Sequence, residues 1–128
     1  MRIQDYDTTW DATTPAEIEA ALRTRHGAGR NAFWLSPRPK EFPKINILVM
    51  GELAYVHYFP ARRNPGYASI GTVPDLEPGE ETVFFPNDTE EPLGIMNEAV
   101  VRFSDALRAA QEFAISAAMP SCIQWSAL

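Results

Sequence analysis

The sequence predicts an α+β fold: one domain over residues 1–128, with a mainly antiparallel sheet of about five or six strands and a helix near each end of the chain. The length suits a single domain. Two runs rich in β-branched and aromatic residues, 45–50 and 53–59, flank Gly51-Glu52, a pattern typical of a hairpin with a type II′ turn. Helical patterns occur only near the two termini, so we expect both helices on one face of the sheet. The opposite face would then remain partly exposed and free to bind.

The first helix is predicted from its capping residues. We expect a short strand at the start of residues 1–10. Thr14 then stands at the N-cap position, Pro15 at the first helical position and Glu17 three residues after the cap, which together form a capping box. Apolar residues at helical spacing follow. The glycines beyond His26 predict that the helix ends near that histidine.

Further strands are predicted between the two helices. Residues 31–35, 67–71 and 82–85 have the composition of strands. Residues 72–81 and 87–92 combine acidic side chains with turn-forming residues, so we expect two exposed acidic loops.

A longer helix is predicted close to the C-terminus. Residues 98–102 fit either a last strand or the first turns of this helix, and the sequence leaves both open. Ser104 and Asp105 are suitable capping residues. An alanine-rich apolar stripe with a period of 3.6 follows them, and Met119-Pro120 ends the pattern.

The composition restricts the class of protein and of partner. Acidic residues number 17 and basic residues 11, and the net charge of −6 disfavours a phosphate-binding surface and so a nucleic-acid partner. The same charge attracts basic proteins and speeds encounter with them. No apolar run approaches the ~20 residues that cross a bilayer, and the N-terminus has no secretory pattern. With a single cysteine as well, we expect a cytoplasmic protein that does not bind membranes.

Few side chains are candidates for catalysis or metal binding. His57 lies within a predicted strand, where histidines are more often structural, and His26 suits the dipole at the expected helix end. Cys122 has no neighbour in sequence that would stabilise a thiolate, so we expect a buried, small apolar residue. No metal motif or phosphate-binding loop occurs, and residues 87–91 lack the glycine and spacing of a calcium loop. We therefore expect no metal and no cofactor.

Aromatic residues are concentrated on the predicted strands. Alternation places Tyr55, His57 and Phe59 on one face of the sheet. Roughly half of the strand aromatics should lie in the core, and the others should point to the opposite face. Exposed aromatics with an acidic rim are typical of a protein-binding surface.

The C-terminal part of the chain resembles a known family. Residues 104–113 look like the final helix of the immunity proteins of bacterial polymorphic toxin systems, first family, and Pro120 and an Ile-x-Trp pattern at Ile123-Gln124-Trp125 follow that helix. The N-terminal helix, the hairpin and the strand that begins at Gly66-Tyr67 match the general layout of the family. The resemblance therefore covers nearly the whole chain.

The resemblance implies an inhibitor that is not an enzyme. Members of the family are encoded beside toxins, often nucleic-acid deaminases, and neutralise them by binding and blocking the active site. It also implies that Trp125 anchors the tail to the core. Because such toxins tend to present basic grooves, we expect the acidic loops to compete by charge mimicry. The expected toxin-binding residues are the acids of both loops and three aromatic or polar anchors: Asp75, Glu77, Glu80, Glu81, Asp88, Glu90, Glu91, Tyr55, His57 and Tyr67.

Two other interpretations stay open on the sequence alone. A small enzyme would use His57 with Cys122 or a carboxylate, and its turnover would fall sharply in His57→Ala. A structural or oligomerisation module would bind no toxin. A toxin gene directly upstream would favour the immunity protein over both.

Overall fold

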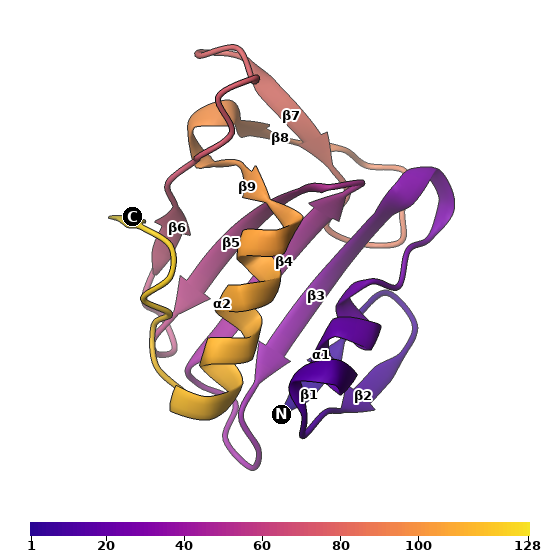
Figure 1. The fold of residues 1–128 in the computed structure, drawn as a ribbon, viewed down its shortest axis with the longest axis vertical. Coiled ribbons are helices and arrows are strands. Elements are labelled where there is room, and N and C mark those ends of the chain that lie inside the picture. Colours follow the sequence, from indigo (N-terminus) through magenta and orange to yellow (C-terminus); the bar gives the residue numbers. More distant parts are fainter.

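The computed structural model describes all 128 residues and consists of an antiparallel sheet, two helices and a separate two-stranded ribbon (Figure 1). The main sheet has the strand order β10-β6-β5-β4-β3-β1-β2, and β9 pairs with β5 along the same edge as β6. The ribbon pairs β7 with β8. The elements in chain order are β1 (Arg2–Gln4), β2 (Thr9–Asp11), α1 (Pro15–Leu22), the 3₁₀ turn η1 (Gly27–Gly29), β3 (Arg30–Ser36), β4 (Lys44–Met50), β5 (Leu53–Phe59), β6 (Tyr67–Ser69), β7 (Glu81–Phe84), β8 (Leu93–Met96), the 3₁₀ turn η2 (Asn97–Ala99), β9 (Val101–Arg102), α2 (Phe103–Ser116) and β10 (Trp125–Ala127).

The central hairpin is present where it was predicted. Strands β4 and β5 pair over their full length, from Lys44 opposite Phe59 to Met50 opposite Leu53. Gly51 has a φ of +60°, the positive value that the first turn position requires, so the predicted hairpin is confirmed. Strand β3 pairs along the other edge of β4.

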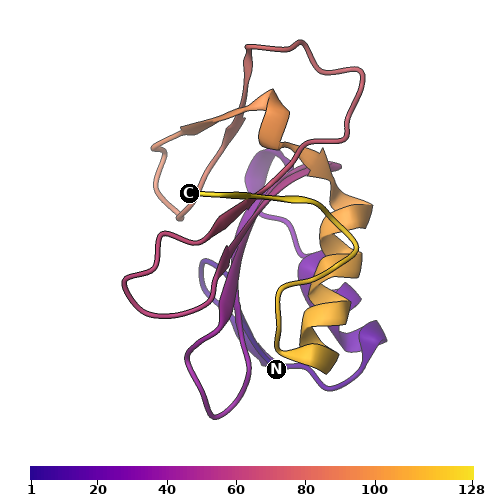
Figure 2. The same cartoon turned by 90° about the vertical axis from the view of Figure 1, so that its left-hand side faces the viewer.

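One face of the sheet carries the main core beneath both helices. Phe33, Ile47 and Val56 lie on three adjacent strands and are fully buried, and Phe113 of α2 packs edge-on against Tyr58. Burying an apolar side chain of this size contributes about 1.5–3 kcal/mol. Figure 2 shows both helices on this side of the sheet. The predicted α+β class, with two helices on one face, is therefore confirmed.

The first helix begins as predicted and ends earlier. The Thr14 hydroxyl accepts the backbone N–H of Glu17, and the Glu17 carboxylate accepts the N–H of Thr14, so the capping box is present. The helix ends at Leu22, because the Arg25 guanidinium donates to the Leu22 carbonyl and takes the place of a further turn. The expected end near His26 is wrong, since that residue precedes η1 as its N-cap.

The second helix differs from the prediction at both ends. It begins at Phe103, and no side chain caps its N-terminus, so the expected cap at Ser104 and Asp105 is wrong. Phe103 is buried in the main core, which fixes the start by packing. The helix ends at Ser116 because Ala117 adopts a left-handed conformation with a φ of +51°, ahead of the expected stop at Met119-Pro120.

Short strands make the main sheet larger than the five or six strands expected. Eight strands take part, because β1, β2, β9 and β10 add two or three residues each along the edges. Residues 98–102 hold the end of η2 and strand β9, so the segment is a turn followed by a strand. The strand expected at 82–85 is present as β7, but it pairs only with β8, a strand that the sequence analysis did not predict. Neither helix is long and apolar enough to cross a membrane.

Candidate functional site

The face of the sheet opposite the helices has a covered end and an open end. Alternation along β4 points Lys44, Asn46, Leu48 and Met50 to this face. Leu48 is 1% exposed because it packs in a second core cluster with Phe84 of the ribbon. Lys44, at the other end of the strand, lies outside that cluster. We call this side of the sheet, together with the outer side of the ribbon, the open face.

An acidic module occupies the covered end. We use this name for residues 72–98, which contain eight carboxylates and no lysine or arginine. The module stands at the top of the molecule in Figure 1. Glu90 has an ionic partner, Arg30 at 3.8 Å, and none of the other seven acids has one within 4.0 Å. Every acid predicted as toxin-binding is exposed and lies in this module: Asp75, Glu77, Glu80, Glu81, Asp88, Glu90 and Glu91.

Asn97 connects the end of β8 to residues 77–82 of the acidic module. Its backbone N–H donates to the Glu80 carbonyl at 2.9 Å, and its side-chain amide donates to the Glu77 carbonyl at 2.9 Å. The same side chain accepts the Thr82 hydroxyl at 2.6 Å. The Tyr6 hydroxyl ties the far side of the ribbon down by donating to the Phe85 carbonyl at 2.6 Å. These bonds order the backbone from which Glu77, Glu80 and Glu81 project before any partner binds. Sequence reasoning did not find Asn97.

The outer side of the ribbon is partly apolar. Glu81, Val83, Gly94 and Met96 share this side, because Val83 pairs with Gly94 and Glu81 with Met96. Val83 is 46% exposed and Met96 is 45% exposed. An exposed apolar strip surrounded by charged groups is typical of a protein-binding surface.

The three expected anchors do not converge. Tyr55 and His57 share the open face, but Tyr55 is only 9% exposed beneath the ribbon, and burial raises the pKa of its hydroxyl. Tyr67 lies on the opposite, helix-covered face, where it packs beside Tyr58 at a ring distance of 6.3 Å. His57 is half-buried and stacks on Phe59 at 3.9 Å.

Both ring nitrogens of His57 have a partner. Nε2 lies 2.7 Å from the Pro65 carbonyl oxygen, which can only accept, so Nε2 carries the proton and donates. Nδ1 lies 3.3 Å from the Tyr55 hydroxyl, from which a neutral ring accepts. This arrangement holds the ring against the loop at residues 60–66 and suits a structural histidine.

Trp125 lies on β10 and contacts the main core. Its ring lies 6.1 Å from that of Tyr58, and its indole N–H donates to the Pro120 carbonyl at 2.7 Å. Strand β10 pairs with β6, so this tail closes one edge of the sheet.

A basic patch occupies the open end of the open face. It consists of cationic and aromatic side chains brought together from β1, β3, β4, β5 and two loops: Arg2, Trp34, Arg38, Lys44, Phe59 and Arg62. Trp34 is 41% exposed, its ring lies 5.7 Å from that of Phe59, and the Lys44 ammonium lies 4.7 Å from its centroid. Glu41 lies beside the patch and pairs with Lys44 and Arg62.

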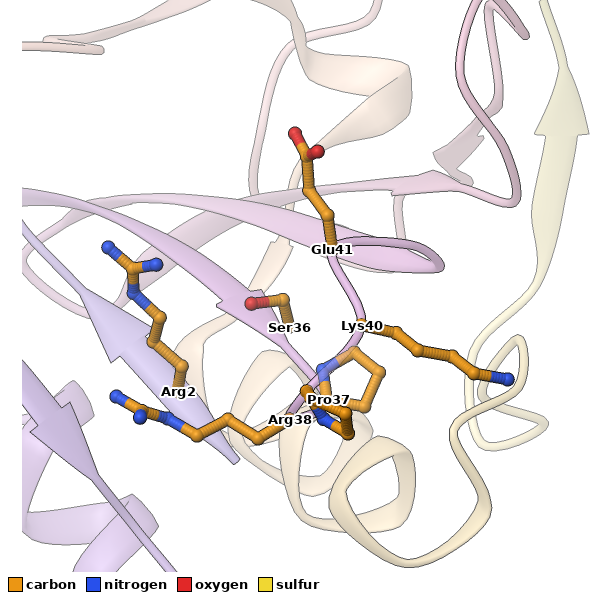
Figure 3. A pocket seen from close by; sticks show the side chains of 7 residues that line it. Arg2, Ser36, Pro37, Arg38, Lys40 and Glu41 are labelled. Atoms are coloured by element: carbon orange, nitrogen blue, oxygen red, sulfur yellow. The ribbon is translucent and has the colours of Figure 1, made fainter.

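A surface hollow of about 460 Å³ adjoins this patch. Figure 3 shows Arg2 and Arg38 extending in the same direction along it, while Lys40 points the other way. Arg38 faces Asp11 at 3.6 Å, and Arg2 donates to the Gln4 side chain at 3.3 Å. The open face therefore carries opposite charges at its two ends. The sequence analysis did not predict the basic end.

Comparison with known families agrees with the resemblance. The family model described as Immunity protein Imm1 matches residues 6–127. This chain belongs to the Imm1 family. It is thus an immunity protein of a toxin system, with a cognate toxin as its partner. No curated protein matches the chain. The Imm1 match includes the acidic module, most of the basic patch and the tail with Trp125.

Cys122 of this Imm1 protein is exposed, which corrects the expectation of a buried residue. It lies in the tail beside α2, where Ser121 hydrogen-bonds to Glu112. Partial burial and the nearby Glu112 carboxylate raise the pKa of the thiol, which disfavours the nucleophilic thiolate. His57 points to the other side of the sheet, because its neighbour Tyr58 is the residue that faces α2. The proposed His57–Cys122 pair is therefore not assembled.

Asp5, Asp7 and His26 form the remaining cluster of metal-ligating types, with ligand atoms within 4.8 Å of one another. The Asp5 side chain is fully buried, and its oxygens accept from the Asp7 and Thr8 backbone N–H groups, from Asn31 and from His26. Burial alone raises the pKa of Asp5, but these hydrogen bonds together hold it below its ordinary value. A cation would have to displace these donors, so the cluster acts as a link between the N-terminal loop and β3.

Proposed function

We propose that this Imm1 protein neutralises a nucleic-acid deaminase toxin in the bacterial cytoplasm by covering its active site with the acidic module. The supporting observation is that this module presents eight exposed carboxylates, of which only Glu90 has a cationic partner. A nucleic-acid enzyme has a basic groove for its substrate, and a rigid array of carboxylates resembles that substrate in charge. The inhibitor needs no bond-making groups of its own.

The charges and the apolar strip contribute different parts of the binding energy. Complementary charges steer encounter and raise the association rate, up to about 10⁸–10⁹ M⁻¹s⁻¹ at low salt. Val83 and Met96 supply apolar surface that is removed from water on contact and slows dissociation. Since hydrogen bonds to Asn97 already order the backbone at Glu77, Glu80 and Thr82, less backbone entropy is lost there on binding.

The expected anchors contribute unequally to this proposal. His57 is half-buried on the open face and lies within reach of a partner that covers that face. Tyr55 is a core residue and supports the ribbon from below. Tyr67 faces the helix side, so it touches the toxin only if the toxin also wraps that edge.

Charge reversal combined with toxin co-expression tests the proposal. The chain is co-expressed with the toxin encoded by the neighbouring gene, and survival, co-purification and deaminase activity on nucleic acid are measured. Glu77→Lys, Glu80→Lys and Glu91→Lys together should slow association at least about tenfold and reduce its salt dependence. Glu19→Lys on α1 is the control and should change the rate little, because it lies on the helix side.

The outcomes separate the parts of the proposal. Failure to protect cells or to bind the neighbouring toxin would refute the immunity role for that pair. Protection with an association rate that is unchanged in the triple variant would show that charge mimicry is wrong while toxin binding stands. A toxin with an activity other than deamination would correct only the class of toxin.

A further inference from the structure

The open face carries opposite charges at its two ends. The acidic module lies where β4 ends at Met50, and the basic patch lies where the same strand begins at Lys44. Figure 2 shows the ribbon on the side of the sheet opposite α2, at one end of the long axis, and the loops that carry Arg38 and Arg62 towards the other end. One partner that lies along this face therefore meets both charges.

A second copy of this chain has the charge pattern that fits. A two-fold axis that lies between two such faces, at right angles to their long axis, places the acidic module of each copy on the basic patch of the other. A two-fold interface uses the same surface twice, so it must be complementary to itself. A face with one acidic and one basic end meets this requirement.

The shapes of the two ends agree with this pairing. The ribbon stands above the sheet at the acidic end, whereas the basic end is uncovered and hollowed beside Arg2 and Arg38. The raised ribbon of one copy would enter the recess of the other. Val83 and Met96 on the ribbon are exposed, as is Trp34 in the patch, so apolar groups meet as well as charges. A standard interface of about 800 Å² per copy would take roughly an eighth of the 6859 Å² surface.

We propose that the free protein forms a two-fold symmetric dimer through its open faces, with the acidic module of each copy against the basic patch of the other. The dimer does not depend on the identity of the toxin. If the proposed function holds as well, the two interactions exclude each other, because both use the acidic module. The dimer would then store the inhibitor with its toxin-binding surface covered, and the toxin would bind only the separated chain.

Sedimentation equilibrium of the purified chain is the first test. The apparent mass should rise with concentration from the 14.3 kDa of one chain towards twice that value and should stop there, because a two-fold interface closes. The proposal is overturned if the apparent mass remains that of one chain up to a protein concentration of about 1 mM at low ionic strength. We take a dissociation constant of about 1 mM as the weakest dimer that supports the proposal. Growth beyond two chains would also overturn it.

A charge exchange tests the pairing of ends. Variant one carries Arg2→Glu, Arg38→Glu and Arg62→Glu, and variant two carries Glu80→Lys, Glu81→Lys and Glu91→Lys. These side chains are all exposed, and circular dichroism and thermal unfolding check that both variants fold. Each variant alone should dimerise at least about tenfold more weakly than the wild type, because like charges then face one another. An equal mixture should form a heterodimer, since both contacts become complementary again.

Each outcome of the charge-exchange experiment either supports or refutes the proposed interface. Restored pairing in the mixture supports the proposed interface. If both variants dimerise as strongly as the wild type, the interface lies elsewhere and the proposal is overturned. Folded variants that stay monomeric when mixed would likewise refute it. If variant one also loses toxin binding while the wild type is monomeric, the basic patch belongs to the toxin and not to a second copy.

Discussion

Replacing Phe84 with alanine should detach the acidic module from the sheet while the rest of the protein stays folded. Phe84 is 0% exposed and is the one fully buried side chain that residues 72–98 contribute. On the same side of the ribbon, Leu93 is 42% exposed and Ile95 is only partly buried. An isolated two-stranded ribbon is marginal in water, so the attachment of the module depends strongly on this ring, with smaller contributions from Leu76, Ile95 and the Tyr6–Phe85 hydrogen bond.

The size of the effect follows from that burial. Truncating a buried phenylalanine to alanine costs about 3–5 kcal/mol. Because each 1.4 kcal/mol is a factor of ten, the equilibrium for opening the ribbon should shift by about 100- to 4,000-fold. The main core of 21 buried residues lies on the other face and loses no contact. If the module binds the toxin as proposed, toxin binding should weaken by at most the same factor, since the module must be ordered again before it binds.

Amide hydrogen exchange followed by NMR measures this shift residue by residue. In Phe84→Ala, the paired amides of β7 and β8 should exchange faster by the factor given above, while amides of β3, β4 and β5 keep near wild-type protection. Val83→Ala, on the exposed side of the same strand, is the control and should change neither group much. Equal acceleration of ribbon and sheet amides would show that both unfold as one unit and would refute the reasoning.

Three further predictions concern other parts of the chain. In thermal unfolding, Gly66→Ala should lower the free energy of unfolding by about 2–3 kcal/mol, because φ is positive there and the new Cβ would overlap the Tyr58 carbonyl oxygen. Gly51→Ala has free space around it and should lower it by only about 1 kcal/mol, so equal losses would contradict this. Alkylation of Cys122 by iodoacetamide at pH 7 should be slower than that of free cysteine, because its thiol pKa is raised; an equal rate would contradict this. The pKa of Asp5 is lowered on folding, so its stabilising effect is present above the unfolded pKa of about 3.9 and is lost as the pH falls through the lower folded pKa. Asp5→Asn should therefore lower the free energy of unfolding in urea by about 1–3 kcal/mol at pH 7. The variant should also lose less stability than the wild type as the pH falls, and an unchanged pH dependence would contradict this.

Local signals were sufficient for the parts of the fold that local chemistry determines. The hairpin of β4 and β5 follows from alternation and from the positive φ of Gly51, and the start of α1 follows from the capping box at Thr14. The end of α1 and the start of α2 were misplaced because side-chain contacts decide them and the sequence pattern does not show those contacts. Phe103, for example, begins α2 because it is buried in the main core, and no capping signal marks it.

The candidate site was predictable only at its acidic end. The acids of residues 72–98 are close together in sequence, so their clustering is visible without a structure. Strand β8 was missed because Gly94 interrupts it and because its pairing depends on Phe84 being buried. The basic patch draws Arg2, Trp34 and Arg62 from separate segments, and only the pairing of the strands brings them together. The alternation around Phe33 and Leu35 was the one signal that could have placed Trp34 on the open face.

The two core clusters stabilise different parts of the molecule. The main core of 21 residues joins both helices to the sheet, whereas the second cluster has six residues, of which Phe84 alone comes from the acidic module. Substitutions among the exposed acids therefore leave both clusters intact and cost little stability. If the acidic module binds the toxin as proposed, this arrangement lets the charges of the module change to match a toxin while the sheet and helices keep the fold. The same separation explains why the main fold follows from apolar patterning, whereas packing does not constrain the surface charges that we propose select the partner.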